Sequence, residues 1–325
     1  MKNHIKPDWD LIIAGAGPAG LSAGIYAGRA GLKVLILEAE APGGKVIKTA
    51  EVENYPGFTS IMGPELGMHF YNQAMAQNCE FMYSGIQEFQ KNDALFEVTL
   101  MNGTVLKSYA LIVATGTKEN KIGIPGEDEY YGNGVSYCAV CDAAFYRDRE
   151  VTVVGGGYAA VEEADYLTRF ASKVTLIHRR QEFRVDDRTL QRARENQKIE
   201  FLLDHVVTRV NGESELVNPE KGITKKKVTS IEIKNVVTNE ERVHETAALF
   251  PFIGAKPITN FIKQKEVLDD NNYVVVNEKM ETKIKGLYAA GDVRVTPLRQ
   301  IVTATSDGSL AGQMAVEYIQ HRDYE

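Results

Sequence analysis

The sequence predicts an α/β protein of two domains, with the second domain inserted into the first. A strand, a glycine-rich turn, a helix and a second strand follow one another at residues 9–38 and again at 149–180. Two further buried strands, "ALIVATGT" (110–117) and "GLYAAGDVR" (286–294), each run into a glycine and lie on either side of the second copy. A chain of 325 residues is long enough for two domains with cores of ordinary size.

The bulk composition is that of a globular protein, with 44% hydrophobic and 25% charged residues. A net charge of −7 argues against a nucleic-acid binder, which would carry a basic surface. No apolar run reaches the ~18 residues that a membrane helix requires. The N-terminus "MKNHIKPDWD" lacks the apolar centre of a signal peptide, so we expect a cytoplasmic protein that binds neither membrane nor nucleic acid.

The first copy has the features of a nucleotide-binding βαβ unit. Its strand "LIIA" leads into "GAGPAG", which places Gly15, Gly17 and Gly20 in a GxGxxG pattern at the start of a helix. The first glycine allows a tight turn, the second lets the backbone approach a pyrophosphate, and the third lets the helix pack on the strand. Glu38 ends the second strand, where a carboxylate can accept a hydrogen bond from a ribose hydroxyl.

The second copy repeats the first with a constant offset. Small residues occupy the same five places in both copies, which makes two unrelated glycine turns a poor explanation. Adding 140 to the positions of Gly15, Gly17, Gly20, Gly24 and Gly31 gives Gly155, Gly157, Ala160, Ala164 and Ala171.

The two copies differ where the second strand ends. Position 38 plus 140 is His178, and the segment "HRRQEFR" places Arg179, Arg180 and Arg184 after it. An acid suits a free ribose 2′-hydroxyl, whereas arginines suit a 2′-phosphate through charge-assisted bonds. The first site is therefore predicted to hold FAD or NAD and the second NADP, with FAD the more economical partner for an NADPH donor. The alternative for "HRRQEFR" is a solvated charge cluster.

The order of these motifs gives the domain boundaries. The FAD-type motifs occur at both ends of the chain and the NADP-type motif between them. We therefore expect the first part of an FAD-binding domain at 1–117, an NADPH-binding domain at 118–248, and the second part of the FAD-binding domain at 249–325. Residues 228–250 alternate like the strands of a meander joined at "TNEE", which we expect to complete the sheet of the inserted domain.

The stretch "SYCAVCDAAFY" (136–146) carries two of the three cysteines as a CxxC pair. A structural zinc site needs about four ligands, and no second CxxC or suitably spaced histidine exists, so a redox dithiol of Cys138 and Cys141 is the stronger interpretation. Asp142 can give or take the protons that dithiol chemistry needs, or it can be a helix cap or a surface acid. Cys79 is expected to be an inert thiol.

With these motifs in place, the chain resembles the low-molecular-weight thioredoxin reductases over essentially its whole length. The matching segments include "GAGPAGLSAGIYAGRAGL", "EVENYPGF", "YCAVCDAAFY" and "GLYAAGDVRVTPLRQIVTATSDGSLA". The resemblance implies a homodimeric NADPH:thioredoxin oxidoreductase with one FAD per chain and thioredoxin bound through a transient mixed disulfide. It implies that Cys138 attacks thioredoxin, that Cys141 faces the flavin, and that Asp142 is the acid/base. It also implies rotation of the inserted domain about hinges near 117–120 and 246–250.

The motifs and the resemblance together give the candidate cofactor residues. For FAD they are Gly15, Gly17, Pro18, Ala19, Gly20, Glu38, Gly44, Lys45, Asn54, Gly116, Gly291, Asp292, Arg299, Gln300 and Ile301. For NADPH they are Gly155, Gly157, Tyr158, Ala159, Ala160, His178, Arg179, Arg180 and Arg184.

Three positions depart from the family's pattern. Tyr158 and Ala159 stand where such reductases usually carry a small polar pair such as Asn-Ser, and the tyrosine could stack on the cofactor or crowd its phosphate. Lys45 replaces a usual glutamine, and its ammonium group could favour the anionic reduced flavin or point to solvent.

Three alternative functions share parts of this pattern. One is a disulfide reductase of the same fold for a glutaredoxin-like or peroxiredoxin-type partner. Another is a ferredoxin-driven relative, which should lack the arginines at 179, 180 and 184. The third is a non-catalytic flavin-binding redox sensor, which the intact CxxCD motif disfavours.

Overall fold

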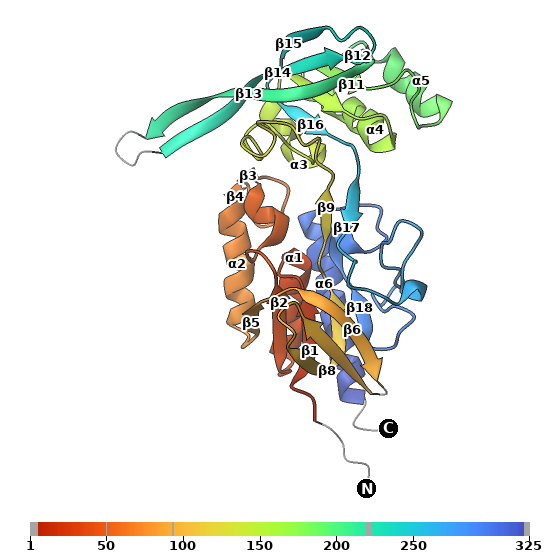
Figure 1. Ribbon diagram of the computed structural model, residues 1–325. Helices are drawn as coiled ribbons and strands as arrows, with labels where there is room; N and C mark the ends of the chain where they lie inside the picture. The colour runs from red at the N-terminus through yellow and green to blue at the C-terminus, as the bar shows by residue number, and fades with distance from the viewer. Residues whose placement is uncertain (1–5, 50, 93, 219–222, 322–325) are drawn as a thin grey trace. The chain divides into compact units, whose positions relative to one another are not determined.

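The computed structural model describes residues 6–49, 51–92, 94–218 and 223–321, and it divides the chain into two compact units (Figure 1). The first unit ends at Lys118 and resumes at Lys256, so the second unit, Glu119–Ala255, is an insertion in it. This confirms the expected architecture. The second boundary falls at 255/256 rather than at the expected 248/249, because residues 249–251 form a strand of the inserted unit's sheet.

The first unit is built on a seven-stranded sheet in the order β5-β2-β1-β8-β7-β6, with β18 also paired to β8. Its strands are β1 (Trp9–Ala14), β2 (Val34–Glu38), β5 (Glu80–Tyr83), β6 (Ile86–Asn92), β7 (Leu95–Leu100), β8 (Val105–Val113) and β18 (Leu287–Ala289). Two short strands, β3 (Glu51–Val52) and β4 (Ile61–Met62), pair with each other. Its helices are α1 (Pro18–Arg29), α2 (Gly63–Met75), α6 (Ile301–His321) and the 3-10 turns η1 (Gly44–Lys48), η3 (Lys265–Val267) and η4 (Gly291–Val293).

The central strands of this sheet are parallel and buried on both faces. Leu11 of β1 lies opposite Val34 of β2 on one side and Ala110 of β8 on the other. Strands covered on both faces are apolar throughout instead of alternating, which is why "LIIA" and "ALIV" could be recognised without a period of two.

Helices α1 and α6 pack unusually close to each other beside this sheet. A Cβ atom on Gly308 would lie 2.0 Å from the carbonyl oxygen of Ala19, and one on Gly312 would lie 2.6 Å from that of Ala23. Only glycine fits at such positions, because any side chain would overlap the facing backbone. The small residues of "GPAGLSAG" and "SDGSLAGQ" therefore let the first and last helices of the chain touch through their backbones.

The inserted unit has a four-stranded parallel sheet in the order β12-β11-β10-β16. Its strands are β10 (Glu150–Val154), β11 (Lys173–His178), β12 (Ile199–Leu203) and β16 (Leu249–Pro251). Its helical segments are α3 (Ala139–Asp142), η2 (Ala143–Tyr146), α4 (Tyr158–Leu167) and α5 (Asp187–Glu195).

The expected meander does not complete that sheet. Strands β13 (His205–Asn218), β14 (Ile223–Asn235) and β15 (Glu241–Glu245) form a separate antiparallel sheet, and only β16 joins the parallel one. The expectation failed because hydrophobic alternation identifies strands but does not say which sheet each strand joins.

The chain passes between the two units through two short segments, β9 (Thr117–Glu119) and β17 (Ala255–Pro257), which pair with each other. Asn120 N–H donates to Gly254 O at 2.9 Å, and Ile258 N–H donates to Gly116 O at 3.0 Å. Among the helices of the described ranges, none has both the length and the apolar character needed to cross a lipid bilayer.

Candidate active site

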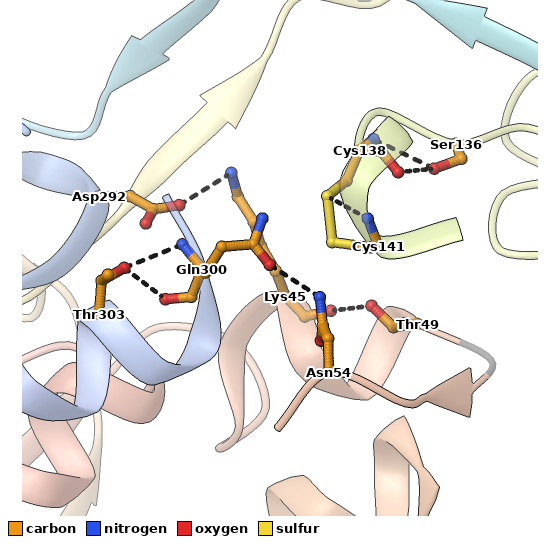
Figure 2. The surroundings of a disulfide bond; sticks show 9 residues. All are labelled: Lys45, Thr49, Asn54, Ser136, Cys138, Cys141, Asp292, Gln300 and Thr303. Carbon is orange, nitrogen blue, oxygen red and sulfur yellow. Dashed lines mark hydrogen bonds and ion pairs between the residues drawn. A yellow bond between two sulfur atoms is a disulfide. The ribbon is translucent and has the colours of Figure 1, made fainter. Parts of the chain in front are cut away.

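Cys138 and Cys141 form a disulfide, with Cα atoms 5.3 Å apart (Figure 2). Cys138 caps the N-terminus of α3, where its sulfur accepts a hydrogen bond from Cys141 N–H at 3.2 Å. Cys79 is separate: it is buried, its thiol donates to Gly24 O at 3.2 Å, and burial raises its pKa to about 11. The two sulfurs of the CxxC motif are thus paired, whereas the third thiol is held in its unreactive protonated form.

Ser136 is a buried residue that sequence reasoning missed, and it organises the segment before the disulfide. Its Oγ accepts a hydrogen bond from Cys138 N–H at 3.1 Å (Figure 2) and lies 3.3 Å from Cys138 O. Its own N–H donates to Leu249 O at 3.0 Å, which ties the segment to β16. The redox motif is therefore fixed to the parallel sheet through one small hydroxyl residue.

Asp142 lies in a partly buried position directly after Cys141. Burial raises the pKa of its carboxyl group, and a hydrogen bond from Ser136 acts in the opposite direction. The phenols of Tyr131 and Tyr146 are close enough for the Asp142 charge to raise their pKa values, in addition to the larger effect of burial. A carboxyl group with a raised pKa is a better proton donor near neutral pH than a surface aspartate, so the surface-acid alternative is disfavoured.

Glu127 is a second residue that sequence reasoning missed. It is 2% exposed, and its carboxylate accepts hydrogen bonds from the N–H groups of Ile122 at 2.9 Å and Gly123 at 2.7 Å. It also accepts a hydrogen bond at 2.6 Å from the hydroxyl of Tyr137, the residue before Cys138. A buried carboxylate that is satisfied in this way ties the backbone at 122–123 to the residue immediately before the redox motif.

In the first unit, two glycines of the GxGxxG turn lie close to other backbone atoms, and the third faces open space. Gly15 has φ 107°, and a Cβ atom there would lie 2.3 Å from Ala114 O. Gly20 packs against the Gly15 carbonyl, 1.8 Å from the place of a Cβ atom. A Cβ atom on Gly17 would meet nothing within 4 Å, so the turn faces open space before the first residue of α1, Pro18. The open space beside Gly17 fits a pyrophosphate group.

The other candidate residues around this turn are joined to it by hydrogen bonds. Glu38 accepts Ala16 N–H at 2.8 Å, which ties the end of β2 to the turn. Gly43 N–H donates to Ala16 O at 2.7 Å, and a Cβ atom on the next residue, Gly44, would lie 3.0 Å from Gly17 Cα. The end of β2 and the residues that follow it therefore meet the turn that precedes α1.

Two candidate pairs link the N-terminal and C-terminal parts of the first unit, as Figure 2 shows. Asn54 Nδ2 donates to Gln300 Oε1 at 3.1 Å. Lys45 Nζ lies 3.7 Å from Asp292 Oδ2 and 2.6 Å from Thr117 Oγ1. The Lys45 ammonium group is therefore held between a carboxylate and a hydroxyl, which argues against the alternative that it simply points to solvent.

The turn at Gly291 and Asp292 is fixed by an ion pair that sequence reasoning missed. The side chain of Asp307 in α6 is 10% exposed. It accepts both the Gly291 N–H at 3.1 Å and a two-pronged bond from Arg294 at 2.6 and 2.7 Å. Gly291 has φ 77°.

The guanidinium group of Arg299 lies 4.6 Å from the ring centre of Tyr273.

The remaining candidates of the first unit lie at element ends. Gly116 has φ 69° and open space at the place of a Cβ atom. Ala19 is the second residue of α1, and its carbonyl oxygen faces Gly308 of α6. Ile301 is the first residue of α6, and Gln300 precedes it, with its N–H bonded to Thr303 Oγ1 at 3.1 Å.

In the inserted unit, the second glycine turn repeats the geometry of the first. Gly155 has φ 154°, and a Cβ atom there would lie 2.4 Å from Phe252 O and 2.6 Å from Ala160 Cβ. Gly157 has no atom within 4 Å of that place. The alanine at the third fingerprint position therefore packs on the turn as Gly20 does, and Ala159 points to the exposed side.

His178 and the arginines have different surroundings. His178 is buried, its ring packs over Gly156 and lies 3.0 Å from Glu182 O, and burial lowers its pKa. Arg179, Arg180 and Arg184 are exposed and lie near enough to lower the pKa of His178 further. In the part of the chain that the structure covers, no carboxylate lies within salt-bridge distance of these three guanidinium groups. Three uncompensated cations at the end of β11 fit an anionic phosphate.

A disulfide on a unit with a nucleotide-type glycine turn, in a chain whose other unit has a turn of the same type, defines a flavin- and nicotinamide-dependent disulfide oxidoreductase. The family model "Pyridine nucleotide-disulphide oxidoreductase" matches residues 9–308. The chain belongs to this family and, within it, to the thioredoxin reductases, which confirms the resemblance seen in the sequence.

The relatives that place it there match over nearly their whole length. The chain is 43% identical to a thioredoxin reductase of Listeria innocua over 312 residues, which is 96% of this chain and 94% of the relative. It is 42% identical to that of Bacillus subtilis over 96% of this chain and 95% of the relative. The crystal structure of the Streptococcus pyogenes thioredoxin reductase matches with a TM-score of 0.90 and 41% identity, covering 96% of this chain and 98% of that one.

Proposed function

We propose that this protein is a thioredoxin-disulfide reductase that passes electrons from NADPH, by way of FAD and the Cys138–Cys141 disulfide, to oxidised thioredoxin. The observation that carries the proposal is the disulfide followed by a partly buried acid, on the unit that also bears the arginine-rich nucleotide turn. The match to relatives named thioredoxin reductases supports thioredoxin as the partner.

For FAD, the fit rests on open backbone at Gly17 and Gly116 and on the polar side chains nearby. When bound, FAD supplies a carrier that takes two electrons from a nicotinamide and gives them to a disulfide. The backbone at Gly17 would bind the pyrophosphate, Glu38 a ribose hydroxyl, and Asp292 the ribityl chain. Lys45 would place a positive charge near the reduced ring.

For NADPH, the fit rests on Gly157 and on the exposed arginines after β11. Gly157 would let the pyrophosphate approach the first turn of α4. Arg179, Arg180 and Arg184 would bind the 2′-phosphate, while buried His178 supports the turn from behind rather than contacting the phosphate.

The chemistry of the dithiol can be written for this chain's own atoms. The Cys138 thiolate attacks the thioredoxin disulfide, forming a mixed disulfide and releasing one thioredoxin thiolate. The Cys141 thiolate then attacks Cys138 Sγ, which re-forms the Cys138–Cys141 disulfide and releases the second thioredoxin thiolate. Two electrons leave this protein, and the released thiolates take up two protons. Asp142 would accept the proton of the Cys141 thiol or return a proton to that sulfur during this exchange.

The redox motif and the NADPH site belong to the same unit, so both must reach one flavin in turn. We propose that the inserted unit rotates about its two connections, as the family resemblance implies. The segments at 117–119 and 255–257 are the positions for such hinges, in place of 246–250, because Leu249 and Phe250 are paired with β10.

We also propose that the protein is a homodimer and that it is located in the cytoplasm. A groove of about 340 Å³ in the first unit is lined by both apolar and polar residues of α1, α2 and α6, including Tyr26, Val302 and Ser306. Such a surface is suited to contact with a second chain, and sedimentation of the FAD-loaded protein would measure whether the mass is twice 36.0 kDa. A reducing compartment would keep Cys79 in the thiol form.

An anaerobic titration tests the whole proposal. The purified protein with bound FAD is titrated with NADPH, and oxidised thioredoxin is then added while the flavin spectrum is followed. We expect NADPH to reduce both the flavin and the disulfide, and thioredoxin to re-oxidise the protein. Oxidation by a glutaredoxin or a peroxiredoxin, but not by thioredoxin, would assign a different partner.

Replacing Arg179 and Arg180 together with alanine should weaken NADPH and leave NADH nearly unchanged. Each charge-assisted bond to a phosphate contributes roughly 1.5–3 kcal/mol, reduced here by solvent exposure, so we expect KM for NADPH to rise ~10- to 100-fold. NADH lacks the 2′-phosphate and therefore loses no contact. Arg194→Ala, which removes an exposed charge from α5, is the matched control. Preference for NADH in the unmodified protein, or electrons accepted only from ferredoxin, would overturn the assignment of "HRRQEFR".

A further inference from the structure

The segment that carries the three arginines, residues 179–186, is attached to the glycine turn at two places. We call it the arginine loop. At the first attachment, Arg184 N–H donates to Gly156 O at 2.7 Å, and Gly157 and Arg184 form a parallel β-bridge. This bond joins the loop to the turn itself, close to the open space beside Gly157.

The second attachment is made by Tyr158, the first residue of α4. Its hydroxyl oxygen accepts a hydrogen bond from Asp186 N–H at 3.1 Å, and the Asp186 carboxylate is also within hydrogen-bonding reach of that hydroxyl. Asp186 caps α5, since its carboxylate accepts Thr189 N–H at 2.9 Å. Tyr158 therefore joins the start of the helix after the glycine turn to the last residue of the arginine loop.

The position of the tyrosine bears on one of the two earlier alternatives, that its ring crowds the phosphate. Because its hydroxyl reaches Asp186 and Gly157 still has open space, the ring does not fill the place where a pyrophosphate would approach. The side chain is 48% exposed, so its contact with the loop is not a by-product of core packing.

The arginine loop brings three cations close together. Arg179, Arg180 and Arg184 lie within a stretch of six residues, and all three act on the same imidazole, that of His178. Glu182 and Asp186 in the same loop offset part of the repulsion among these cations, and the two attachments hold the loop in place against the rest. A fixed loop presents its cations in one arrangement and so binds a phosphate without a further loss of conformational entropy.

We propose that Tyr158 is a positioning residue that holds the arginine loop against the glycine turn and thereby sets the preference for a 2′-phosphorylated nucleotide. It acts through Asp186 N–H and does not contact the phosphate. The proposal rests on the assignment of NADPH as the donor. It also explains why a bulky residue is tolerated where such reductases usually carry asparagine.

The test compares two ligands that differ only in the 2′-phosphate, 2′,5′-ADP and 5′-AMP. Their Kd values are measured by calorimetry at pH 8 on the oxidised, FAD-loaded protein and on its Tyr158→Phe and Tyr158→Ala variants. Tyr158→Phe removes the hydroxyl and keeps the ring. We expect it to weaken 2′,5′-ADP about three- to tenfold, the effect of one hydrogen bond, and to leave 5′-AMP within about twofold. Tyr166→Phe, on the same helix, is the matched control and should change neither ligand.

Each other outcome has one meaning. An unchanged ratio of the two Kd values in Tyr158→Phe overturns the positioning role. Equal weakening of both ligands in Tyr158→Ala, with no effect in Tyr158→Phe, would instead show that the ring stacks on the nucleoside. If the unmodified protein does not prefer 2′,5′-ADP at all, the NADPH assignment itself fails, and this result is distinct from a failure of Tyr158.

Discussion

The Cys141→Ser variant is expected to bind FAD, to lose its flavin absorbance when NADPH is added, and to reduce thioredoxin at no measurable rate. The remaining Cys138 thiolate can attack thioredoxin, but nothing in the variant can resolve the mixed disulfide by the intramolecular route. Cys138→Ser should be equally inactive, because it lacks the attacking thiolate. Turnover is measured by NADPH oxidation coupled to thioredoxin, and flavin reduction by anaerobic spectroscopy.

Cys79→Ser is the control for this prediction. Its thiol is buried, has a pKa raised to about 11, and bonds to the backbone of α1. Its replacement should leave turnover with thioredoxin intact. The two active-site variants also differ from each other: Cys141→Ser should accumulate a covalent complex with thioredoxin on a non-reducing gel, and Cys138→Ser should not. Full disulfide reductase activity in Cys141→Ser would contradict the proposed mechanism.

Asp142→Asn is expected to slow the dithiol steps ~10²- to 10⁴-fold, as loss of an acid/base group does, while FAD binding and flavin reduction by NADPH are kept. The amide can still accept the Ser136 hydrogen bond, so the local geometry should survive. Asp148→Asn is the matched control, since this exposed residue has φ 57°, a conformation that asparagine adopts readily. Unaffected turnover in Asp142→Asn would reduce Asp142 to a structural role.

The same variant should change the pH dependence of stability. Burial raises the pKa of Asp142 in the folded protein above its unfolded value. Between those two pKa values the folded state binds more protons than the unfolded state, so this group lowers stability as the pH rises through that window. Asp142→Asn removes the buried charge and is expected to unfold at higher urea concentration than the unmodified protein at neutral pH, with the difference shrinking in acid. A loss of stability in Asp142→Asn at pH 7 would contradict the raised pKa.

The sequence was sufficient to predict elements that follow from local pattern. The two glycine turns, the strands around them and the insertion of one unit in the other all follow from apolar runs and from glycines at fixed spacing. Gly15, Gly20 and Gly155 meet backbone atoms within 2.4 Å of the place of a Cβ atom, so steric overlap alone dictates their identity. The disulfide could be predicted because a CxxC pair is local.

What could not be predicted depends on contacts between distant residues. The bond of Asn54 to Gln300 joins residues 246 positions apart, and the Arg294–Asp307 ion pair is visible only once η4 and α6 are known to meet. In the sequence, Ser136 and Glu127 look like ordinary polar residues of a loop. Their hydrogen bonds become apparent only in the folded protein, where both residues are buried. The Tyr158–Asp186 bond crosses from α4 to α5, whereas the sequence showed only a bulky residue at an unusual position.

The close packing of α1 on α6 has a consequence for the order in which the protein can be made. β1, α1 and β2 leave the ribosome before the inserted unit, but the sheet they belong to lacks β18, and α1 lacks the helix that Gly308 and Gly312 bring against it, until residues 287–312 have followed. The inserted unit is continuous in sequence and has all its strands long before that. The nascent chain therefore holds an incomplete first unit while the whole inserted unit is made, and the first unit is completed only when α6 has left the ribosome.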